Sequence, residues 1–119
     1  MAVRGDREVD LGSLGMVPCR PGLRALEAIE SSHASGSLTA IAAELARAPG
    51  LRTTISILYE CHLDFAALSK DAKRHTREQI AAGVLEVGLG KVKTACWDLV
   101  FSAWAITPDP DAEPDSEKA

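Results

Sequence analysis

Apolar residues recur every three or four positions from Leu23 onward, and this spacing predicts a mainly α-helical fold. Residues that end helices separate the periodic stretches: Gly36, Pro49 with Gly50, and Gly88 or Gly90. The predicted helices cover residues 23–30, 38–46 and 52–65, a stretch opened by Thr76, and residues 91–105. We therefore expect about five helices in a compact bundle.

Capping residues support two of these helix starts. Ser37 is a natural N-cap for the second helix, and Thr76 with Gln79 has the spacing of a capping box at the fourth. The third helix is apolar on several sides, which is typical of a helix buried at the centre of a bundle.

The first 22 residues have a different pattern. Polar and apolar residues alternate over residues 8–11, glycines at 12 and 15 offer a turn, and an apolar pair at 16–17 precedes Pro18. This pattern predicts a short N-terminal β-hairpin that leads into the helices through an extended segment.

Acidic residues gather at the end of the sequence. Residues 107–119 hold five carboxylates against one lysine, so residues 1–106 are neutral within a chain of net charge −4. The end segment has three prolines and no large apolar residue, which predicts a disordered acidic tail after a single helical domain at 1–106. Such a tail either improves solubility and competes with partners or is a frayed end without a role.

Length and composition limit the class of protein. A chain of 119 residues makes one domain. The sequence has no uncharged apolar run that approaches the roughly 18 residues needed to cross a membrane. Charges near the N-terminus argue against a signal peptide, so we expect a cytoplasmic protein. The cysteines, Cys19, Cys61 and Cys96, are too widely spaced for a zinc site and are expected to be reduced, with the last two buried.

No motif for catalysis or for cofactor binding stands in the sequence. Gly88-Leu89-Gly90-Lys91 is better explained as a turn between helices than as a phosphate loop. His33, His62 and His75 have no nucleophile at a fixed spacing, and Glu27 with Glu30 is expected to be an exposed pair. The sequence therefore predicts a protein that is not an enzyme and uses no metal or cofactor.

A helix-turn-helix DNA-binding regulator is the alternative interpretation of residues 41–56. The turn between the two helices is longer than the 3–4 residues of that motif, and few basic residues flank it. We therefore expect no nucleic-acid binding.

Trp97, Phe101 and Trp104 form the candidate partner-binding cluster. Their spacing of i, i+4 and i+7 puts three rings on one face of an α-helix, and aromatic rings supply much of the binding energy at interfaces. The same rings could fill the core of a chain that is only 4% aromatic, and the sequence leaves both interpretations open.

The order of elements matches a known pattern: a hairpin, a helix opening with Leu23-Arg24-Ala25-Leu26-Glu27, a leucine-rich helix, an apolar helix, a capped helix at Thr76, and a helix pair joined by Gly88-Leu89-Gly90. Over residues 7–105 this resembles the small tail assembly chaperones of siphophage-like tail clusters, particularly those of gene transfer agents and related prophages.

The resemblance implies a non-enzymatic protein of the bacterial host cytoplasm. Such chaperones bind the long helical tape measure protein while the tail tube polymerises around it. The implied partners are therefore the tape measure protein, the tail tube protein and further copies of the chain, with no membrane involved. A phage-borne inhibitor of a host protein, using the same helical surface, is a further alternative.

Overall fold

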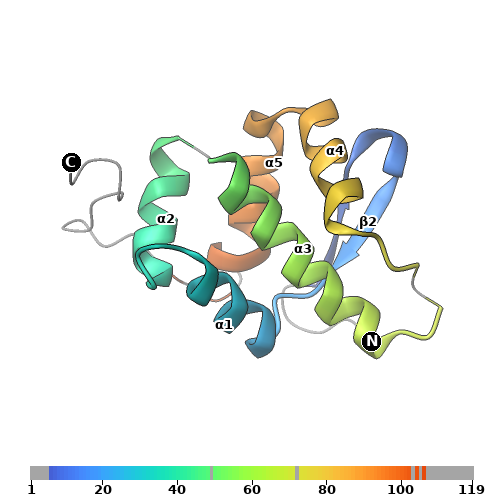
Figure 1. The fold of residues 1–119 in the computed structure, drawn as a ribbon, viewed down its shortest axis with the longest axis horizontal. Helices are drawn as coiled ribbons and strands as arrows, with labels where there is room; N and C mark the ends of the chain where they lie inside the picture. The colour runs from blue at the N-terminus through green and yellow to red at the C-terminus, as the bar shows by residue number, and fades with distance from the viewer. Residues whose placement is uncertain (1–5, 49, 72, 103, 105, 107–119) are drawn as a thin grey trace.

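A computed structural model describes residues 6–48, 50–71, 73–102, 104 and 106 of the chain. Two strands precede the helices (Figure 1). In chain order the elements are β1 (Arg7–Asp10), the 3₁₀ turn η1 (Gly12–Leu14), β2 (Met16–Cys19), α1 (Leu23–Ser32), α2 (Leu38–Arg47), α3 (Leu51–Leu68), α4 (Arg77–Val87), α5 (Leu89–Cys96) and the π-helical turn η2 (Trp97–Ser102). The predicted mainly α fold with an N-terminal hairpin is confirmed.

The hairpin is antiparallel, and it presents one apolar face to the helices. Val9 pairs with Val17 across the two strands, and both side chains are buried. At the turn, Gly12 and Gly15 have positive φ angles, which explains the glycines there. The turn packs on α4, where a Cβ at Gly83 would lie 2.8 Å from the Cβ of Leu11.

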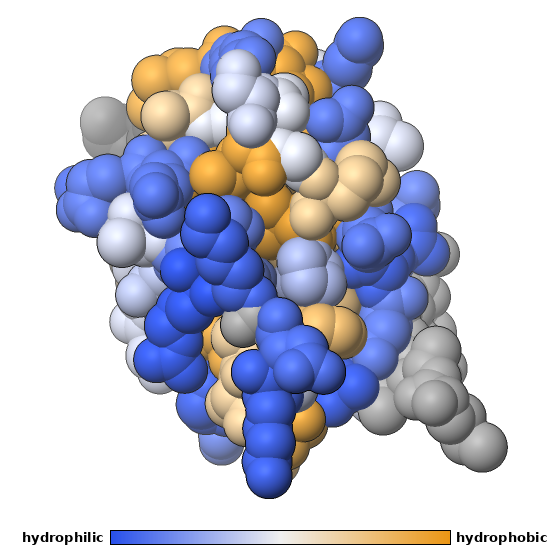
Figure 2. Space-filling view, turned by 90° about the vertical axis from the view of Figure 1, so that its right-hand side faces the viewer, coloured by the Kyte–Doolittle hydropathy of each residue, from blue (hydrophilic) through white to orange (hydrophobic). Residues whose placement is uncertain are grey.

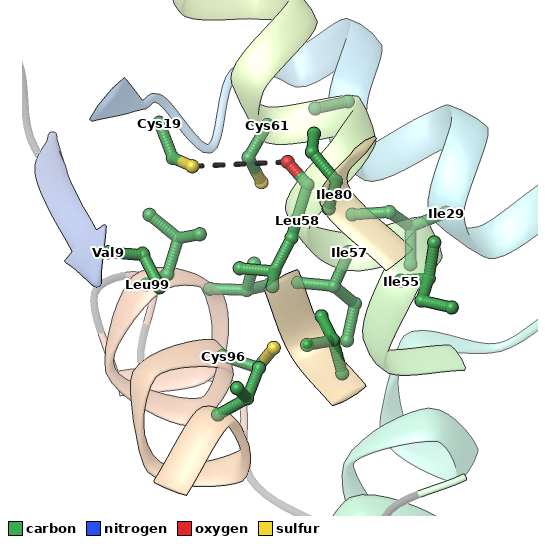
Figure 3. Packing of buried hydrophobic residues seen from close by; sticks show 14 of the residues in the cluster. Val9, Cys19, Ile29, Ile55, Ile57, Leu58, Cys61, Ile80, Cys96 and Leu99 are labelled. Atoms are coloured by element: carbon green, nitrogen blue, oxygen red, sulfur yellow. Dashed lines mark hydrogen bonds between the residues drawn. The ribbon is translucent and has the colours of Figure 1, made fainter. Parts of the chain in front are cut away.

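The third helix, α3, lies at the centre of the molecule. In Figure 1, α3 runs diagonally through the centre, and it packs against α1, β2, α4 and α5. Ile57, Leu58 and Cys61 are fully buried, and Figure 3 shows them among residues from the hairpin and the later helices. The prediction of a central helix is confirmed, because a helix that is apolar on several sides needs neighbours on several sides.

Asp64, near the end of α3, fixes the start of α1. Gly22 is the N-cap of α1 and offers no capping side chain, but the Asp64 carboxylate accepts a hydrogen bond from the backbone N–H of Ala25 at 3.0 Å. Arg24 donates from Nε to the other oxygen of Asp64 and from a terminal nitrogen to Glu60. One buried carboxylate therefore replaces the missing cap and joins two helices.

The predicted caps of the later helices are present. The Ser37 hydroxyl accepts from the N–H of Ala40, and Thr76 and Gln79 form a reciprocal capping box. Gly88 ends α4 with a φ of 103°, a conformation that favours glycine. Gly88 alone joins the two helices, because α5 begins at Leu89 and already contains Gly90 and Lys91. The predicted helix junction is therefore present, but the predicted turn over Gly88–Lys91 is shorter than expected and α5 begins two residues before the predicted start at 91.

The last predicted helix differs from the structure. We predicted one α-helix over residues 91–105, but α5 ends at Cys96 and the chain continues as the wider π turn η2. Leu99, Val100 and Phe101 are all fully buried, and a wide turn lets three consecutive side chains reach the core. The N–H of Ile106 donates to the carbonyl of Phe101, five residues back.

Two further expectations bear on the ends and on membranes. The predicted acidic tail, residues 107–119, lies outside the described residues, so the division at 106 stays a prediction. Among the helices that the structure describes, none is long and apolar enough to span a membrane.

We expect Gly22→Ala to destabilise the protein through Asp64. An added Cβ at Gly22 would lie 2.5 Å from Asp64 Oδ2, so the carboxylate must leave its bonds. In chemical denaturation, Gly22→Ala should lower the free energy of unfolding of the natural chain by about 2 kcal/mol. In a chain that already carries Asp64→Ala, the same substitution should cost at least about 1 kcal/mol less.

Gly90→Ala is the matched control, since no atom lies within 4 Å of a Cβ at that position. It should leave stability unchanged or raise it by about 0.5 kcal/mol. The same cost for Gly22→Ala in both backgrounds would contradict the role given to Asp64.

Candidate partner-binding surface

The three aromatic residues of the predicted cluster differ in their exposure to solvent. Phe101 is fully buried, and its ring lies 5.4 Å from the ring of Trp97, measured between centroids. Trp97 is half-buried and packs against the core. Of the two interpretations that the sequence left open, the core interpretation therefore holds for Phe101, which lies in the π turn.

Trp104 remains at the surface, with 38% of its area exposed. Its indole Nε1–H donates a hydrogen bond to the carbonyl of Pro21 at 3.0 Å, which ties the last described turn to the segment before α1. The Trp104 ring is therefore held in place by its bonded polar atom while part of its area remains exposed.

Two leucines at the same end of the molecule are among the most exposed apolar side chains described. Leu23, at the start of α1, is 74% exposed, and Leu68, at the end of α3, is 73% exposed. Gly22 contacts Asp64, and Leu68 follows Asp64 by one helical turn, about 6 Å along the axis. We call this region, defined by Leu23, Leu68 and Trp104, the α1/α3 end.

The other large exposed apolar residues are scattered. They are Met16 in β2, Leu51 at the start of α3 and Leu85 in α4. Single exposed apolar residues are normal on protein surfaces, whereas several at one end of a small domain indicate a contact surface. Neither leucine was predicted as a surface contact: Leu23 belongs to the apolar stripe of the first predicted helix, and Leu68 lies beyond the predicted end of the third helix at residue 65.

Most carboxylates that could have formed a catalytic pair have structural partners. The Glu30 side chain accepts from the N–H of Leu38 at the start of α2, while Glu27 is exposed and makes no pair with it. Glu86 accepts from the backbone N–H and the hydroxyl of Ser13 in the hairpin turn. These groups hold loops and helix ends, as Asp64 does.

A buried pair of histidines links the hairpin, α3 and the connector before α4. His62 Nδ1 lies 3.0 Å from the carbonyl oxygen of Pro18, and Nε2 lies 3.0 Å from the backbone nitrogen of His75. A carbonyl only accepts and an N–H only donates, so the proton of His62 resides on Nδ1. The rings of the two histidines are 5.2 Å apart, a proximity that no local motif indicates.

His75 is only 7% exposed, and its Nδ1 has no hydrogen-bond partner in the described structure. Burial lowers the pKa of His75 below its ordinary value of 6.5, and the neighbouring His62 and Lys73 lower it further, while Gln79 offsets part of the shift. The pair is therefore a structural clamp, and burial favours the neutral form of His75 within it.

The third histidine lies beside a shallow hollow. His33 contacts Ser35 through Nδ1 and Glu44 through Nε2. The hollow next to it, between the α1–α2 loop and the start of α3, has a volume of about 170 Å³, which is smaller than typical ligand sites. Over the described residues, no group of three potential ligands is positioned to hold a metal ion.

All three cysteines are free and buried, as predicted for Cys61 and Cys96. Burial raises the pKa of Cys19 to about 12 and raises the pKa values of the other two thiols as well. Figure 3 shows Cys19 facing the carbonyl of Leu58, with the three thiols inside the apolar cluster. Thiols in this setting are poor nucleophiles.

The helix-turn-helix interpretation finds little support in the packing. Ile55, Ile57 and Leu58 belong to the core, so the apolar residues of the suggested recognition helix are buried. Arg52 is the only basic residue in the first two turns of α3. That helix therefore presents little positive charge to a phosphate backbone.

Comparison with protein-family models, with curated proteins and with solved structures finds no match for this chain.

We expect Phe101→Ala and Trp104→Ala to differ strongly in stability. Replacing the fully buried Phe101 with alanine leaves a cavity in the core, which should lower the free energy of unfolding by about 3–5 kcal/mol. Trp104→Ala loses one hydrogen bond and partial packing, for a cost of about 1 kcal/mol. Denaturant titration of both variants checks this, and similar costs would contradict the placement of Phe101.

We expect the stability of the protein to fall as the pH drops below about 6.5, in part because of His75. Its folded-state pKa is lowered, so below the unfolded-state pKa the unfolded chain binds more protons. Thermal melts between pH 7.5 and 5.5 should show a steeper fall for the natural chain than for His75→Gln. Carboxylates and His62 remain in both proteins, so parallel profiles would refute the assignment.

Proposed function

We propose that this protein is a non-catalytic assembly chaperone of the phage tail kind, which binds apolar helical segments of a tape measure protein. The exposure of Leu23, Leu68 and Trp104 at the α1/α3 end carries the proposal. A long helical protein with apolar stripes aggregates unless the stripes are covered, and two leucines beside an indole ring offer a matching apolar contact.

The bonding of the polar side chains supports a binding role over catalysis. Asp64, Glu30 and Glu86 accept backbone hydrogen bonds, and His62 is bonded at both ring nitrogens. An active site needs a nucleophile or base that is free to meet a substrate. The order of the elements, a hairpin followed by five helices, also agrees with what the resemblance implies.

A small contact area suits the role. Three side chains of this size give modest affinity, since each well-buried leucine contributes about 1.5–3 kcal/mol. Modest affinity allows tail tube subunits to displace the chaperone as the tube grows. An inhibitor of a folded host protein would need a larger interface for a lasting complex.

The test is co-expression with the long helical protein encoded in a neighbouring gene, followed by size-exclusion chromatography at low and high salt. We expect the partner to be soluble only with this chain present and to co-elute with it. Leu23→Ser combined with Leu68→Ser should reduce the soluble partner about tenfold, because two apolar contacts are lost.

Leu85→Ser is the matched control, because Leu85 is 65% exposed on α4, away from the α1/α3 end (Figure 1). It should leave the soluble partner unchanged. If the partner stays insoluble beside a well-folded chain, the chaperone proposal fails. If both leucine variants act alike, the contact lies elsewhere.

A further inference from the structure

The connector between α3 and α4 carries positive charge that the described structure leaves unpaired. Residues 70–77 contain four basic residues and one acid, Asp71, for a net charge of +3 (4 − 1). Three of the four basic side chains are exposed and the fourth is half-buried. The basic residues are Lys70, Lys73, Arg74 and Arg77.

Several basic residues elsewhere in the described chain have partners, in contrast to the connector. Arg7 pairs with Asp98, Arg20 with Asp6, and Arg24 with Asp64 and Glu60, while Lys93 donates to the carbonyl of Ala46. No ion pair links any of the four connector cations to another described residue. The positive charge is therefore concentrated beside one part of the surface.

That part adjoins the α1/α3 end. Leu68 is the last residue of α3, and Lys70 follows it by two positions. Figure 2 views the side of the molecule along which the connector runs, and there hydrophilic side chains border apolar surface. A partner seated on Leu68 would consequently meet the connector cations at its edge.

We propose that the segment recognised at the α1/α3 end is an amphipathic helix whose apolar stripe is flanked by acidic residues. The stripe covers Leu23, Leu68 and Trp104, and the acidic flank faces Lys70, Lys73 and Arg74. The inference rests on the proposed function and specifies its partner: opposite charge at the edge of an apolar contact sets the direction and register of the helix and speeds association.

The apolar residues favour a helix over a nucleic acid as the occupant. A phosphate backbone would use the four cations, but it gains nothing from two leucines that are more than 70% exposed. An acidic amphipathic helix uses both features at once. Nucleic acid therefore enters the test as a competing ligand.

The experiment uses the full chain and two synthetic helical peptides. Both have the same length and the same leucine stripe, and they differ only in flanking residues, which are glutamate in one and lysine in the other. Titration at 50 mM salt, followed by peptide fluorescence anisotropy, should give at least tenfold tighter binding of the glutamate peptide. The preference should shrink at 500 mM salt.

Variants of the chain locate the contact. Lys73→Glu with Arg74→Glu should remove or invert the peptide preference, whereas Lys91→Glu, an exposed charge on α5, should leave it intact. Leu23→Ser with Leu68→Ser should weaken both peptides. Circular dichroism of each variant confirms that the helices are retained.

Three outcomes overturn the inference: equal binding of the two peptides, failure of the glutamate peptide to bind, or a preference that survives the charge reversal. Binding of a 20-base single strand or a 20-base-pair duplex more tightly than the glutamate peptide also overturns it. Equal peptide binding with a solubilised partner in co-expression rejects only the charge recognition. An insoluble partner rejects the chaperone role itself.

Discussion

The Asp64 carboxylate joins the start of α1 to α3. It lies in α3, is almost fully buried, and satisfies the N–H of Ala25 at a helix start that has no cap of its own. It also pairs with Arg24, which reaches across to Glu60. These bonds hold the start of α1, which carries Leu23, against the last turns of α3, which carry Leu68. The candidate binding surface is therefore a consequence of one buried acid and the glycine that makes room for it.

The internal use of polar groups shapes what the protein can do. Carboxylates cap α1, α2 and the hairpin turn. The hydrogen bond from the His75 N–H to His62 joins the connector before α4 to α3. Asp64 and His62 satisfy the buried backbone N–H groups of Ala25 and His75, and leaving such groups without partners costs more than most single contacts gain. What remains for a partner is an exposed patch of leucine and indole with unpaired cations at its border. Such a surface supports recognition by shape and charge.

Local signals predicted much of this fold, and long-range contacts account for the differences. The caps at Ser37 and Thr76 and the glycine turn of the hairpin depend on neighbours within four residues, so the sequence reveals them. The π turn after Cys96 depends on how Leu99, Val100 and Phe101 meet α3 and the hairpin, which no spacing rule contains. For the same reason the aromatic cluster was assigned one face. The α1/α3 end was not predicted because Leu23 and Leu68 are 45 positions apart (68 − 23), and the contact of Asp64 with the start of α1 is not a local pattern.

The three buried thiols allow local opening of the native protein to be measured at three places. Cys19 lies in the hairpin, Cys61 in α3 and Cys96 at the end of α5, and each is fully buried. A thiol reagent can reach each sulfur only when the element around it opens, so the three labelling rates measure three local opening equilibria in the native protein. Because all three cysteines belong to the natural chain, the labelling rates can show whether the hairpin separates from the helices before α3 loosens, and whether a bound helix slows either step.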